Sequence, residues 1–307
     1  MNLNTGLCAG IDIGTNTILM VIGKQTEQGA WSILRDEHGI ARLGEGLSAS
    51  GRISDAACER AVAILTRYAQ IIVDAGVTHV RAVATSAMRD AENASDVRDR
   101  LERALGHPIN VIDGTTEASL TYAGTVDGDV GSSVVVDIGG GSTELSFGND
   151  GRVELAESVN VGVVRLTENC LTPKPSSAVD VATALSIVHQ AVTSAAARIP
   201  AGIHMYAVAG TPVALAALEL GLADFDARHI HGHVLERHVV ERWMLRLTAM
   251  TTDELRSLPG IHPQRADVLP AGAIILFAIM QAVGTLRCTV STAGLRYGVM
   301  MTAQGDV

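Results

Sequence analysis

The sequence contains few aromatic residues, prolines and cysteines. Phe, Trp and Tyr together make up 3% of its 307 residues, and there are 8 prolines and 4 cysteines. Because 47% of the residues are hydrophobic, a disordered or fibrous protein is excluded, and the cores must be built from aliphatic side chains. The cysteines lie far apart without a Cys-x-x-Cys pair, so we expect neither a zinc ribbon nor a disulfide framework.

The sequence also lacks a basic tract and a long apolar run. With 23 Lys and Arg against 33 Asp and Glu, the formal net charge is −10, which disfavours a nucleic-acid-binding protein. The chain does not open with a basic segment followed by an apolar one, and its longest apolar run, residues 271–283, is too short to cross a bilayer. We therefore expect a cytoplasmic protein that does not enter the membrane, in which this run forms a buried helix ending at Gly284.

One segment of the sequence occurs twice. An apolar run leads into Asp12-Ile-Gly14 and continues into a second apolar run, and the same order recurs around Asp137-Ile-Gly139, 125 residues later. A strand, an aspartate, a glycine-containing turn and a second strand, repeated at about one domain length, indicate an internal duplication. We predict two domains, residues 1–128 and residues 129–307, with the boundary in a Gly- and Asp-rich stretch.

The rest of the chain alternates between helical and strand patterns, as in an α/β fold. Apolar residues at helical spacing predict helices, and short Val- and Ala-rich runs predict strands. Helices are expected at about residues 55–75, 95–105, 176–198, 234–250 and 270–283, and after residues 113 and 210. Strands are expected at residues 80–84, 109–112, 205–209 and 287–290.

Three glycine-containing turns follow short apolar strands. Glycine lets backbone N–H groups approach an oxyanion, and hydroxyl and amide side chains add donors. One such turn alone is more often an ordinary hairpin, but the duplicated pair indicates phosphate binding, and neither GxxxxGK[ST] nor GxGxxG is present. The candidate phosphate-binding residues are Gly14, Thr15, Asn16 and Thr17, then Gly139, Gly140, Gly141, Ser142 and Thr143, and finally Gly210 and Thr211. The aspartates before the first two turns, Asp12 and Asp137, are candidates to hold a hydrated Mg²⁺.

Short motifs along nearly the whole chain resemble those of the exopolyphosphatase/guanosine pentaphosphate phosphohydrolase family. They span residues 12–17, 84–89, 114–118, 137–144, 209–211, 262–269 and 291–298, and the fourth is the most specific. The resemblance implies the fold of the actin, sugar-kinase and heat-shock chaperone superfamily, with two ribonuclease-H-like (actin-like ATPase) α/β domains facing a central cleft. Longer members carry a C-terminal helical domain, and we expect no such additional domain here.

The resemblance implies hydrolysis of a terminal phosphoanhydride by water that a glutamate activates. Glu117 matches that glutamate, and its expected place in the first turn of a helix favours an ionised carboxylate independently, through the helix dipole. Asp137 and Glu144 match the metal-binding carboxylates of the family, with Mg²⁺ as cofactor, and Arg89 matches a phosphate-binding arginine. Without the resemblance, Glu117 would be interpreted as a common capping-turn glutamate and Arg89 as a solvated loop charge.

The chain departs from the family pattern at two positions beside Glu117. Thr116 stands where a second acid is common, and Ser119 stands where an arginine is usual. The loss of that cation, together with the negative net charge, puts in doubt a high affinity for long polyphosphate.

The roles of two arginines and of a histidine tract stay open at this point. Arg265 and Arg296 lie in family-like motifs, and either a substrate contact or a structural role fits them. If the tract His229-Ile-His231-Gly-His233 were extended, its imidazoles would share one face and suit zinc. It contains a glycine, precedes a predicted helix and falls where the family has a loop, so we interpret it as a polar surface loop.

The leading hypothesis is a Mg²⁺-dependent exopolyphosphatase that releases orthophosphate from the ends of inorganic polyphosphate. Hydrolysis of guanosine pentaphosphate to the tetraphosphate is a close alternative, because it needs the same residues. A kinase of this superfamily and length would be expected to carry a Cys/His zinc signature, which this sequence lacks. A phosphate or alarmone sensor would have no use for a water-activating carboxylate such as Glu117, so both hypotheses are less favoured. The family also implies a homodimer, although no surface stripe in the sequence points to one.

Overall fold

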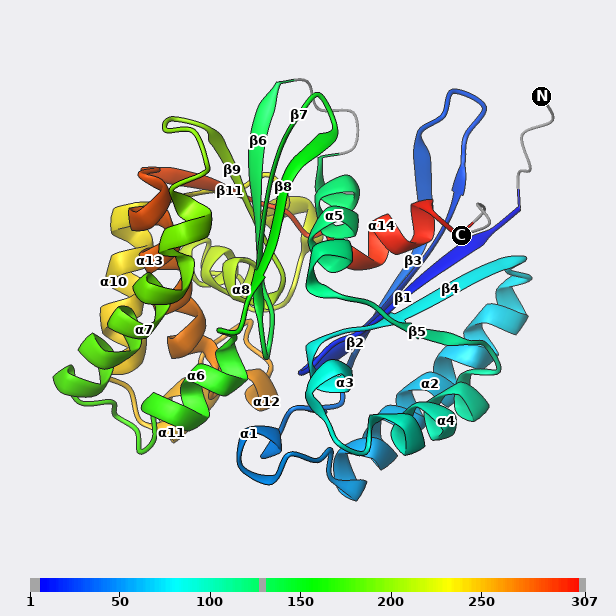
Figure 1. Cartoon of the computed structure of the whole chain (residues 1–307), viewed down its shortest axis with the longest axis horizontal. Coiled ribbons are helices and arrows are strands. Elements are labelled where there is room, and N and C mark those ends of the chain that lie inside the picture. The colour runs from blue at the N-terminus through cyan, green and yellow to red at the C-terminus, as the bar shows by residue number, and fades with distance from the viewer. Residues whose placement is uncertain (1–5, 127–130, 304–307) are drawn as a thin grey trace. The chain divides into compact units, whose positions relative to one another are not determined.

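The computed structural model describes residues 6–126 and 131–303, and it confirms the predicted α/β class (Figure 1). Its contacts divide the chain into two compact units, one formed by Met1–Gly124 with Leu295–Val307 and the other by Thr125–Gly294. The last helix, α14 (Leu295–Met301), therefore belongs to the first unit, whereas a division at residue 128 assigns it to the second half. Residues 127–130, where that boundary was predicted, lie outside the described residues.

The first unit is built on a mixed sheet of five strands in the order β3-β2-β1-β4-β5. The strands are β1 (Cys8–Ile13), β2 (Thr17–Gln25), β3 (Trp31–Ile40), β4 (His79–Ala84) and β5 (Ile109–Val111). The first three are antiparallel neighbours, whereas β4 runs parallel to β1 and β5 runs parallel to β4. Besides α14, the helices are α1 (Leu47–Ser50), α2 (Asp55–Ala75), α3 (Ser86–Asp90), α4 (Ala94–Leu105) and α5 (Gly114–Thr125).

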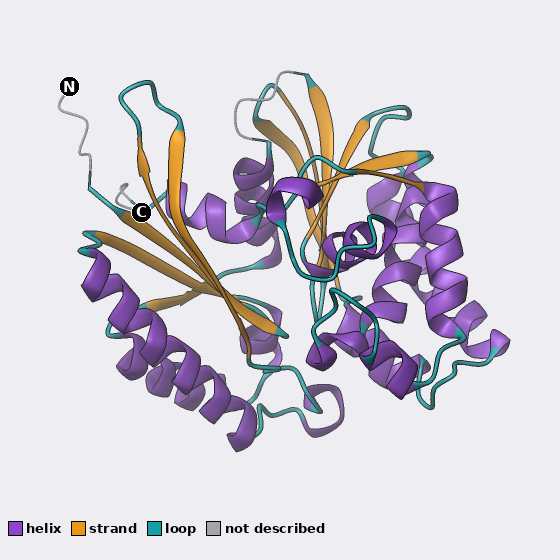
Figure 2. Cartoon of the chain, turned by 180° about the vertical axis from the view of Figure 1, so that it is seen from behind, coloured by secondary structure: helices purple, strands orange, loops and turns teal. Residues whose placement is uncertain are grey.

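Helices cover both faces of this first sheet. Successive side chains of a strand point to opposite faces, so Ile11 packs in the core with α2 and α4, which lie side by side in Figure 1 and, from behind, in Figure 2. Gly10 faces α14, whose backbone comes so close that a Cβ would not fit. On that face Leu120 of α5 and Leu295 of α14 pack on Val83. The site segments that follow β1 and β4 are thus carried by strands with helices on both faces.

The second unit is built on a sheet of six strands in the order β10-β11-β9-β6-β7-β8. The strands are β6 (Ser132–Ile138), β7 (Thr143–Asn149), β8 (Arg152–Val159), β9 (His204–Val208), β10 (Val234–Glu236) and β11 (Arg287–Val290). Antiparallel pairing joins β6, β7 and β8, whereas β9 runs parallel to β6 and β11 parallel to β9. The helices are α6 (Val163–Cys170), α7 (Ala178–Ala196), α8 (Gly210–Glu219), α9 (Ala227–Ile230), α10 (Arg237–Thr248), α11 (Thr252–Arg256), α12 (Pro263–Ala266) and α13 (Leu269–Val283).

The longest apolar run of the sequence forms α13 in the core of the second unit. Nearly all its side chains are buried, and it ends at Gly284 in the left-handed conformation, as predicted. Of the helices in residues 6–126 and 131–303, none is long and apolar enough to cross a membrane.

One predicted helix is shorter than expected. The pattern predicts a helix over residues 234–250, but its first three residues form β10, which pairs with β11, and α10 begins only at Arg237. Leu235 is buried between exposed Val234 and Glu236, which is the alternation of a strand.

The two sheets repeat each other in register as well as in strand order. The Gly14 N–H donates to the carbonyl three residues later (2.9 Å), and the Gly139 N–H does the same (3.0 Å). The pairing register shifts after Ile22 between β2 and β3, and after Phe147, 125 residues later, between β7 and β8. This agreement supports the predicted internal duplication.

In each unit, the carboxyl ends of parallel strands meet at one edge of the sheet. In the first unit, Ile13 of β1 pairs with Ala84 of β4, which pairs with Val111 of β5. In the second unit, Asp137 near the end of β6 pairs with Val208 at the end of β9. The chain segments that follow these strand ends contain most of the predicted site residues: 14–17, 85–89, 112–117, 139–143 and 209–211.

Candidate active site

The turn after β1 is held by hydrogen bonds from other segments of the first unit. The carbonyl of Thr15 accepts from the N–H of Gly44 (2.8 Å), and that of Asn16 accepts from the N–H of Ala41 (3.2 Å). The Thr15 hydroxyl accepts from the N–H of Ala87 at the start of α3 (3.2 Å). Because a hydroxyl that accepts keeps its own proton, Thr15 can anchor α3 and still donate to a phosphate.

Asn16 carries a buried amide in this turn. It is 8% exposed, and its side-chain oxygen has no hydrogen-bond partner within residues 6–126 and 131–303. An unpartnered buried amide is costly, which favours a ligand contact at this position. Thr17 closes the turn, since its carbonyl accepts from the Gly14 N–H, and Asp12 lies on the sheet face that α14 covers.

Arg89 and Glu117 form an ion pair at the same sheet edge. Nη1 of Arg89 donates to Oε2 of Glu117 (2.6 Å) and to the carbonyl of Ile112 (3.0 Å). The Glu117 side chain is 8% exposed and that of Arg89 is 23% exposed. Glu117 occupies the first turn of α5, as predicted, where the helix dipole favours the carboxylate. The glutamate is therefore fixed in position, with its charge opposed by a guanidinium.

The start of α5 is stabilised by Asp113, which precedes it. The Thr116 N–H donates to Oδ1 of Asp113 (2.7 Å), and this hydrogen bond holds the pKa of Asp113 below its ordinary value. The Glu117 N–H donates to the Asp113 carbonyl (3.0 Å). Ser119, which replaces the usual arginine, donates its hydroxyl to the Thr115 carbonyl within the helix (2.8 Å).

The turn after β6 directs its carbonyl groups towards α6. The carbonyls of Gly139 and Gly140 accept from the first two N–H groups of α6 (2.9 and 2.8 Å), and the carbonyl of Gly141 accepts from Nε of Arg165 (3.1 Å). Because these three carbonyl oxygens accept hydrogen bonds from α6, they point away from the side of the turn where N–H groups could bind an anion.

The two hydroxyls of this turn are also used inside the unit. Ser142 donates to Oε1 of Glu144 (2.7 Å), and Thr143 donates to the carbonyl of Val161 (2.6 Å). Both residues are buried, and a hydroxyl has only one proton to donate. Phosphate binding by these residues therefore falls to their backbone N–H groups.

Asp137 and Glu144 lie directly opposite each other on β6 and β7, on the face opposite to core residues such as Leu145. Mg²⁺ prefers oxygen ligands, is commonly bound through one or two carboxylates and keeps several waters, so this pair fits it. Here and in the rest of the described chain, no group of three or more His, Cys, Asp or Glu residues is arranged to hold a metal ion, so the candidate ligands at this place are the two carboxylates alone. At the equivalent place in the first unit, Leu19 is opposite Asp12, so the first sheet lacks the second carboxylate.

The third turn joins β9 to α8. Ala209 has a positive φ of 72°, and the guanidinium of Arg265 lies against Gly210, in the space that a Cβ would take. Burial lowers the pKa of Arg265, and no carboxylate pairs with it in the described part of the chain. A guanidinium at the N-terminus of a ten-residue helix favours an anion there. Thr211 is buried against Gly272.

Arg296 has a structural role. Its guanidinium donates to both carboxylate oxygens of Asp36 on β3 (2.8 and 2.7 Å), and the residue is 5% exposed. Burial raises the pKa of Asp36, but hydrogen bonds from His38 and Arg296 outweigh it and hold this pKa well below its usual range. Burial and the charge of Asp36 raise the pKa of the adjacent Tyr297 to about 12. The motif at residues 291–298 thus fastens α14 to β3.

The histidine tract forms the end of α9 and the turn after it. His229 contacts Asp226 (3.1 Å), and Nδ1 of His231 accepts from the Thr292 N–H (3.2 Å). Because His229 and His231 have separate partners, and no metal-binding cluster occurs in residues 6–126 or 131–303, the interpretation as a polar loop is the better one.

Sequence reasoning did not find two relationships in this site. One is the pairing of Arg89 with Glu117, and the other is a hydrogen bond from the Ser158 hydroxyl to Oε1 of Glu144 (2.6 Å). The Ser158–Glu144 hydrogen bond could have been predicted from the internal duplication. β8 takes the place that β3 has in the first sheet, which puts Ser158 opposite Glu144, as Glu144 is opposite Asp137. The pairing of Arg89 with Glu117 depends on the placing of α3 beside α5, for which the sequence holds no local signal.

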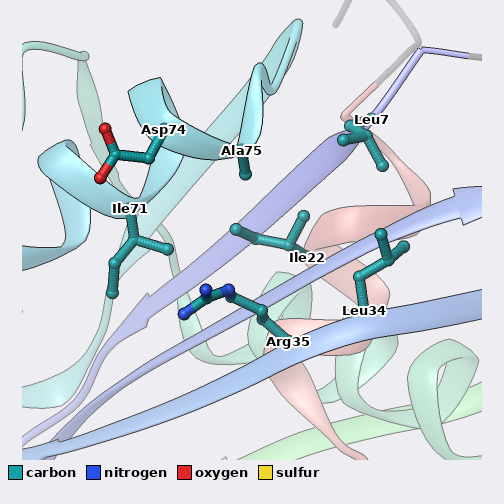
Figure 3. A pocket seen from close by; sticks show the side chains of 7 residues that line it. All are labelled: Leu7, Ile22, Leu34, Arg35, Ile71, Asp74 and Ala75. Carbon is teal, nitrogen blue, oxygen red and sulfur yellow. The ribbon is translucent and has the colours of Figure 1, made fainter.

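A pocket of about 350 Å³ lies at the other end of the first sheet (Figure 3). Its lining combines aliphatic side chains with one arginine and one aspartate: Leu7, Ile22, Leu34, Arg35, Ile71, Asp74 and Ala75. None of the predicted site residues lines it, since Leu7 precedes β1 whereas the turn at Gly14 follows it. The candidate active site is therefore the turn edge and not this pocket.

Comparisons with known proteins identify the family of the chain. The sequence model of the Ppx/GppA phosphatase family matches residues 21–305. Exopolyphosphatase 2 of Mycobacterium tuberculosis is 35% identical over 315 residues, covering 97% of this chain and 98% of that protein. The guanosine-5'-triphosphate,3'-diphosphate pyrophosphatase of Vibrio vulnificus is 29% identical, covering 96% of this chain but 59% of that protein.

The fold has close counterparts among solved structures. The crystal structure of the Aquifex aeolicus member of the Ppx/GppA family superposes with a TM-score of 0.81 at 28% identity, covering 97% of each chain. The chain belongs to the Ppx/GppA phosphatase family and is a phosphoanhydride hydrolase with the two-domain actin-like fold, as the resemblance of its motifs predicts.

Proposed function

We propose that this member of the family is a Mg²⁺-dependent exopolyphosphatase, which removes orthophosphate from the ends of inorganic polyphosphate using water activated by Glu117. The observation that carries the proposal is the buried Glu117 carboxylate, held by Arg89 at the edge where glycine turns end the strands. The name of the M. tuberculosis relative, which the chain matches over almost its whole length, supports the choice of substrate.

Glu117 is suited to act as the general base. The oxygen of a water molecule would attack the terminal phosphorus while its proton passes to the Glu117 carboxylate. The bond between that phosphorus and the bridging oxygen then breaks, and the shortened chain leaves with the electron pair. Arg89 and the first turn of α5 hold the carboxylate in one orientation, which spares the reaction the cost of ordering the base.

Backbone N–H groups would supply most of the phosphate contacts. The Gly14 and Gly139 N–H groups are bonded within their turns, so the N–H groups that the turns offer are those of residues 15–16 and 140–142. The Thr15 hydroxyl keeps a proton to donate. In the second unit, Arg265 beside Gly210 would add a cation for a further phosphate.

Asp137 and Glu144 would hold Mg²⁺ together with waters and phosphate oxygens, and Asp12 is a further candidate ligand. When bound, Mg²⁺ would offset the negative charge of the phosphates and polarise the bond that breaks.

Hydrolysis of guanosine pentaphosphate is the second candidate, favoured by the name of the V. vulnificus relative. Orthophosphate release with Mg²⁺ from long polyphosphate, short polyphosphate and guanosine pentaphosphate tests both. A higher kcat/KM on polyphosphate supports the proposal, and a higher value on the guanosine substrate transfers it to the alternative. If no orthophosphate is released from any of the three substrates, both candidate activities are contradicted, and the kinase and sensor hypotheses must be considered again.

A further inference from the structure

We propose that Ser158 is a positioning residue, which together with Ser142 holds Glu144 by one carboxylate oxygen and so turns the other towards the phosphate-binding turn. The inference deepens the proposed function and rests on it in one respect, namely that Glu144 is a ligand of the metal ion.

Asp137, Glu144 and Ser158 form one row across three neighbouring strands. Asp137 on β6 is directly opposite Glu144 on β7, and Glu144 is directly opposite Ser158 on β8. Residues opposite each other on adjacent strands point to the same face, with Cβ atoms about 5 Å apart. The serine is therefore the outer neighbour of the carboxylate pair.

Two serine hydroxyls donate to the same oxygen of Glu144. The Oγ atoms of Ser158 and Ser142 lie 2.6 and 2.7 Å from Oε1. Glu144 is 2% exposed, so these donors replace water as the solvation of that oxygen. Each hydroxyl uses its only proton here, which gives the two serines a role towards the carboxylate and not towards a phosphate.

The hydrogen bonds fix a torsion that is otherwise soft. The last torsion of a glutamate is broad, so packing of the side chain alone does not set the plane of the carboxylate, whose two oxygens are equivalent. With Oε1 held by the serines, Oε2 lies on the side of Gly139, 4.0 Å from the place of a Cβ on that glycine. Oε2 is then the oxygen presented to a metal ion at the turn.

The duplication supports this assignment. The row in the first unit that corresponds to Asp137, Glu144 and Ser158 is Asp12, Leu19 and His38. There the second position holds no carboxylate, and the third holds no hydroxyl. The serine thus occurs in the row that has a carboxylate to orient.

The test compares metal binding by the full chain and by single variants, without substrate. Free Mn²⁺ is followed by electron paramagnetic resonance during titration, and Glu144→Gln gives the value for a lost ligand. We expect Ser158→Ala to weaken Mn²⁺ binding about tenfold, the lower end of the range for residues that support a metal ligand. Ser158→Thr, which keeps the hydroxyl, should stay within about twofold of the wild type.

Ser146→Ala is the matched control. Ser146 lies on the same face of β7, is 1% exposed, and its hydroxyl has no hydrogen-bond partner in the described part of the chain. Its variant loses the same atom from the same buried surface and should bind Mn²⁺ like the wild type. The Mg²⁺ concentration for half-maximal phosphate release should rise in Ser158→Ala by the same factor as the Mn²⁺ dissociation constant, with kcat at saturating Mg²⁺ nearly unchanged.

Wild-type Mn²⁺ affinity in Ser158→Ala, or in Glu144→Gln, overturns the proposal. If Ser158→Ala does not fold, Ser142→Ala removes the other donor to the same oxygen and carries the same expectation. A wild-type protein that binds Mn²⁺ but releases no phosphate contradicts the proposed function alone, because the Mn²⁺ titrations still decide the role of Ser158.

Discussion

Nη1 of Arg89 lies 2.6 Å from Oε2 of Glu117, although the two residues are 28 positions apart in the chain. This ion pair joins α3, which follows β4, to the first turn of α5, which follows β5. A partly buried carboxylate that is held by a guanidinium keeps both its place and its charge balance, and removing one partner leaves the other uncompensated. The ion pair therefore both links α3 to α5 and holds the proposed general base.

Replacing Glu117 by glutamine should lower kcat for orthophosphate release by about 10²–10⁴, because the amide has no basic oxygen to accept the proton. The shape of the side chain is kept, so KM should change by less than about threefold. Glu219→Gln is the control, since Glu219 accepts hydrogen bonds from Arg242 and Trp243 but lies in the second unit away from the turns. A kcat within threefold of the wild type in Glu117→Gln would remove the glutamate from its role as base.

Arg265 and Arg296 should respond to substitution in opposite ways. Arg265→Met removes a cation that no carboxylate pairs with in residues 6–126 and 131–303, so KM for polyphosphate should rise about tenfold with little change in the unfolding midpoint. Arg296→Met removes the guanidinium that is bound to both oxygens of Asp36 and should cost about 3 kcal/mol in the free energy of unfolding. Steady-state kinetics and urea unfolding of both variants check this. If Arg265→Met is destabilised and its KM is unchanged, Arg265 has a structural role, as Arg296 does.

Ser119→Arg should increase the affinity for long polyphosphate. The variant restores a cation two residues after Glu117 on α5, and an exposed charge pair contributes up to about 1 kcal/mol, or about fivefold in KM. The effect should shrink as salt is added. Ser95→Arg on α4 makes the same change in net charge at an exposed position and should leave KM unaltered. Equal effects of the two variants would point to net charge and not to position.

The Asp36–Arg296 pair should make the stability of the first unit depend on pH below about 4. The pKa of Asp36 is lower in the folded chain than the value near 3.9 of an unfolded one, so its ionised form stabilises the fold at neutral pH. That contribution is lost as the pH falls through the acid range. Asp36→Asn should therefore cost about 2 kcal/mol at pH 7 and clearly less at pH 3.

The two tryptophans allow this loss to be measured in one unit. Trp31 lies on β3 of the first unit and Trp243 on α10 of the second, so a Trp243→Phe background leaves fluorescence that reports the first unit. Urea unfolding of this background with and without Asp36→Asn, at pH 7 and pH 3, gives the difference directly. If Asp36→Asn lowers the free energy of unfolding equally at pH 7 and pH 3, the ion pair is not the source of the stabilisation.

Much of the fold follows from local patterns in the sequence. The helical spacing of residues 55–75 and the apolar run before Gly284 act within one element, and both helices form where the pattern predicts them. The turns at Gly14 and Gly139 are equally local, because an apolar strand, an aspartate and a glycine fix them. Glu117 also lies in the first turn of its helix as predicted, since Asp113 provides the cap.

The features that sequence reasoning missed all depend on pairing between distant segments. Arg296 and Asp36 are 260 residues apart, so nothing near either one indicates that α14 returns to the first sheet. β10 forms because Leu235 finds a partner strand in β11, against a helical pattern in its own neighbourhood. The Thr143 hydroxyl suggests a phosphate donor in the sequence, and only the fold reveals its other acceptor, the carbonyl of Val161.

Because α14 packs on the first sheet, the order in which the two units can be completed during synthesis differs from the order in which they begin. The second unit is continuous in the chain and has all its strands and helices once residue 294 has left the ribosome. The first unit begins earlier but lacks the helix that covers Gly10 and binds Asp36 until residues 295–301 follow. Glu117 belongs to this unit, so the unit whose synthesis begins first is completed after the other one, and the nascent chain carries an unfinished hydrolase until α14 emerges.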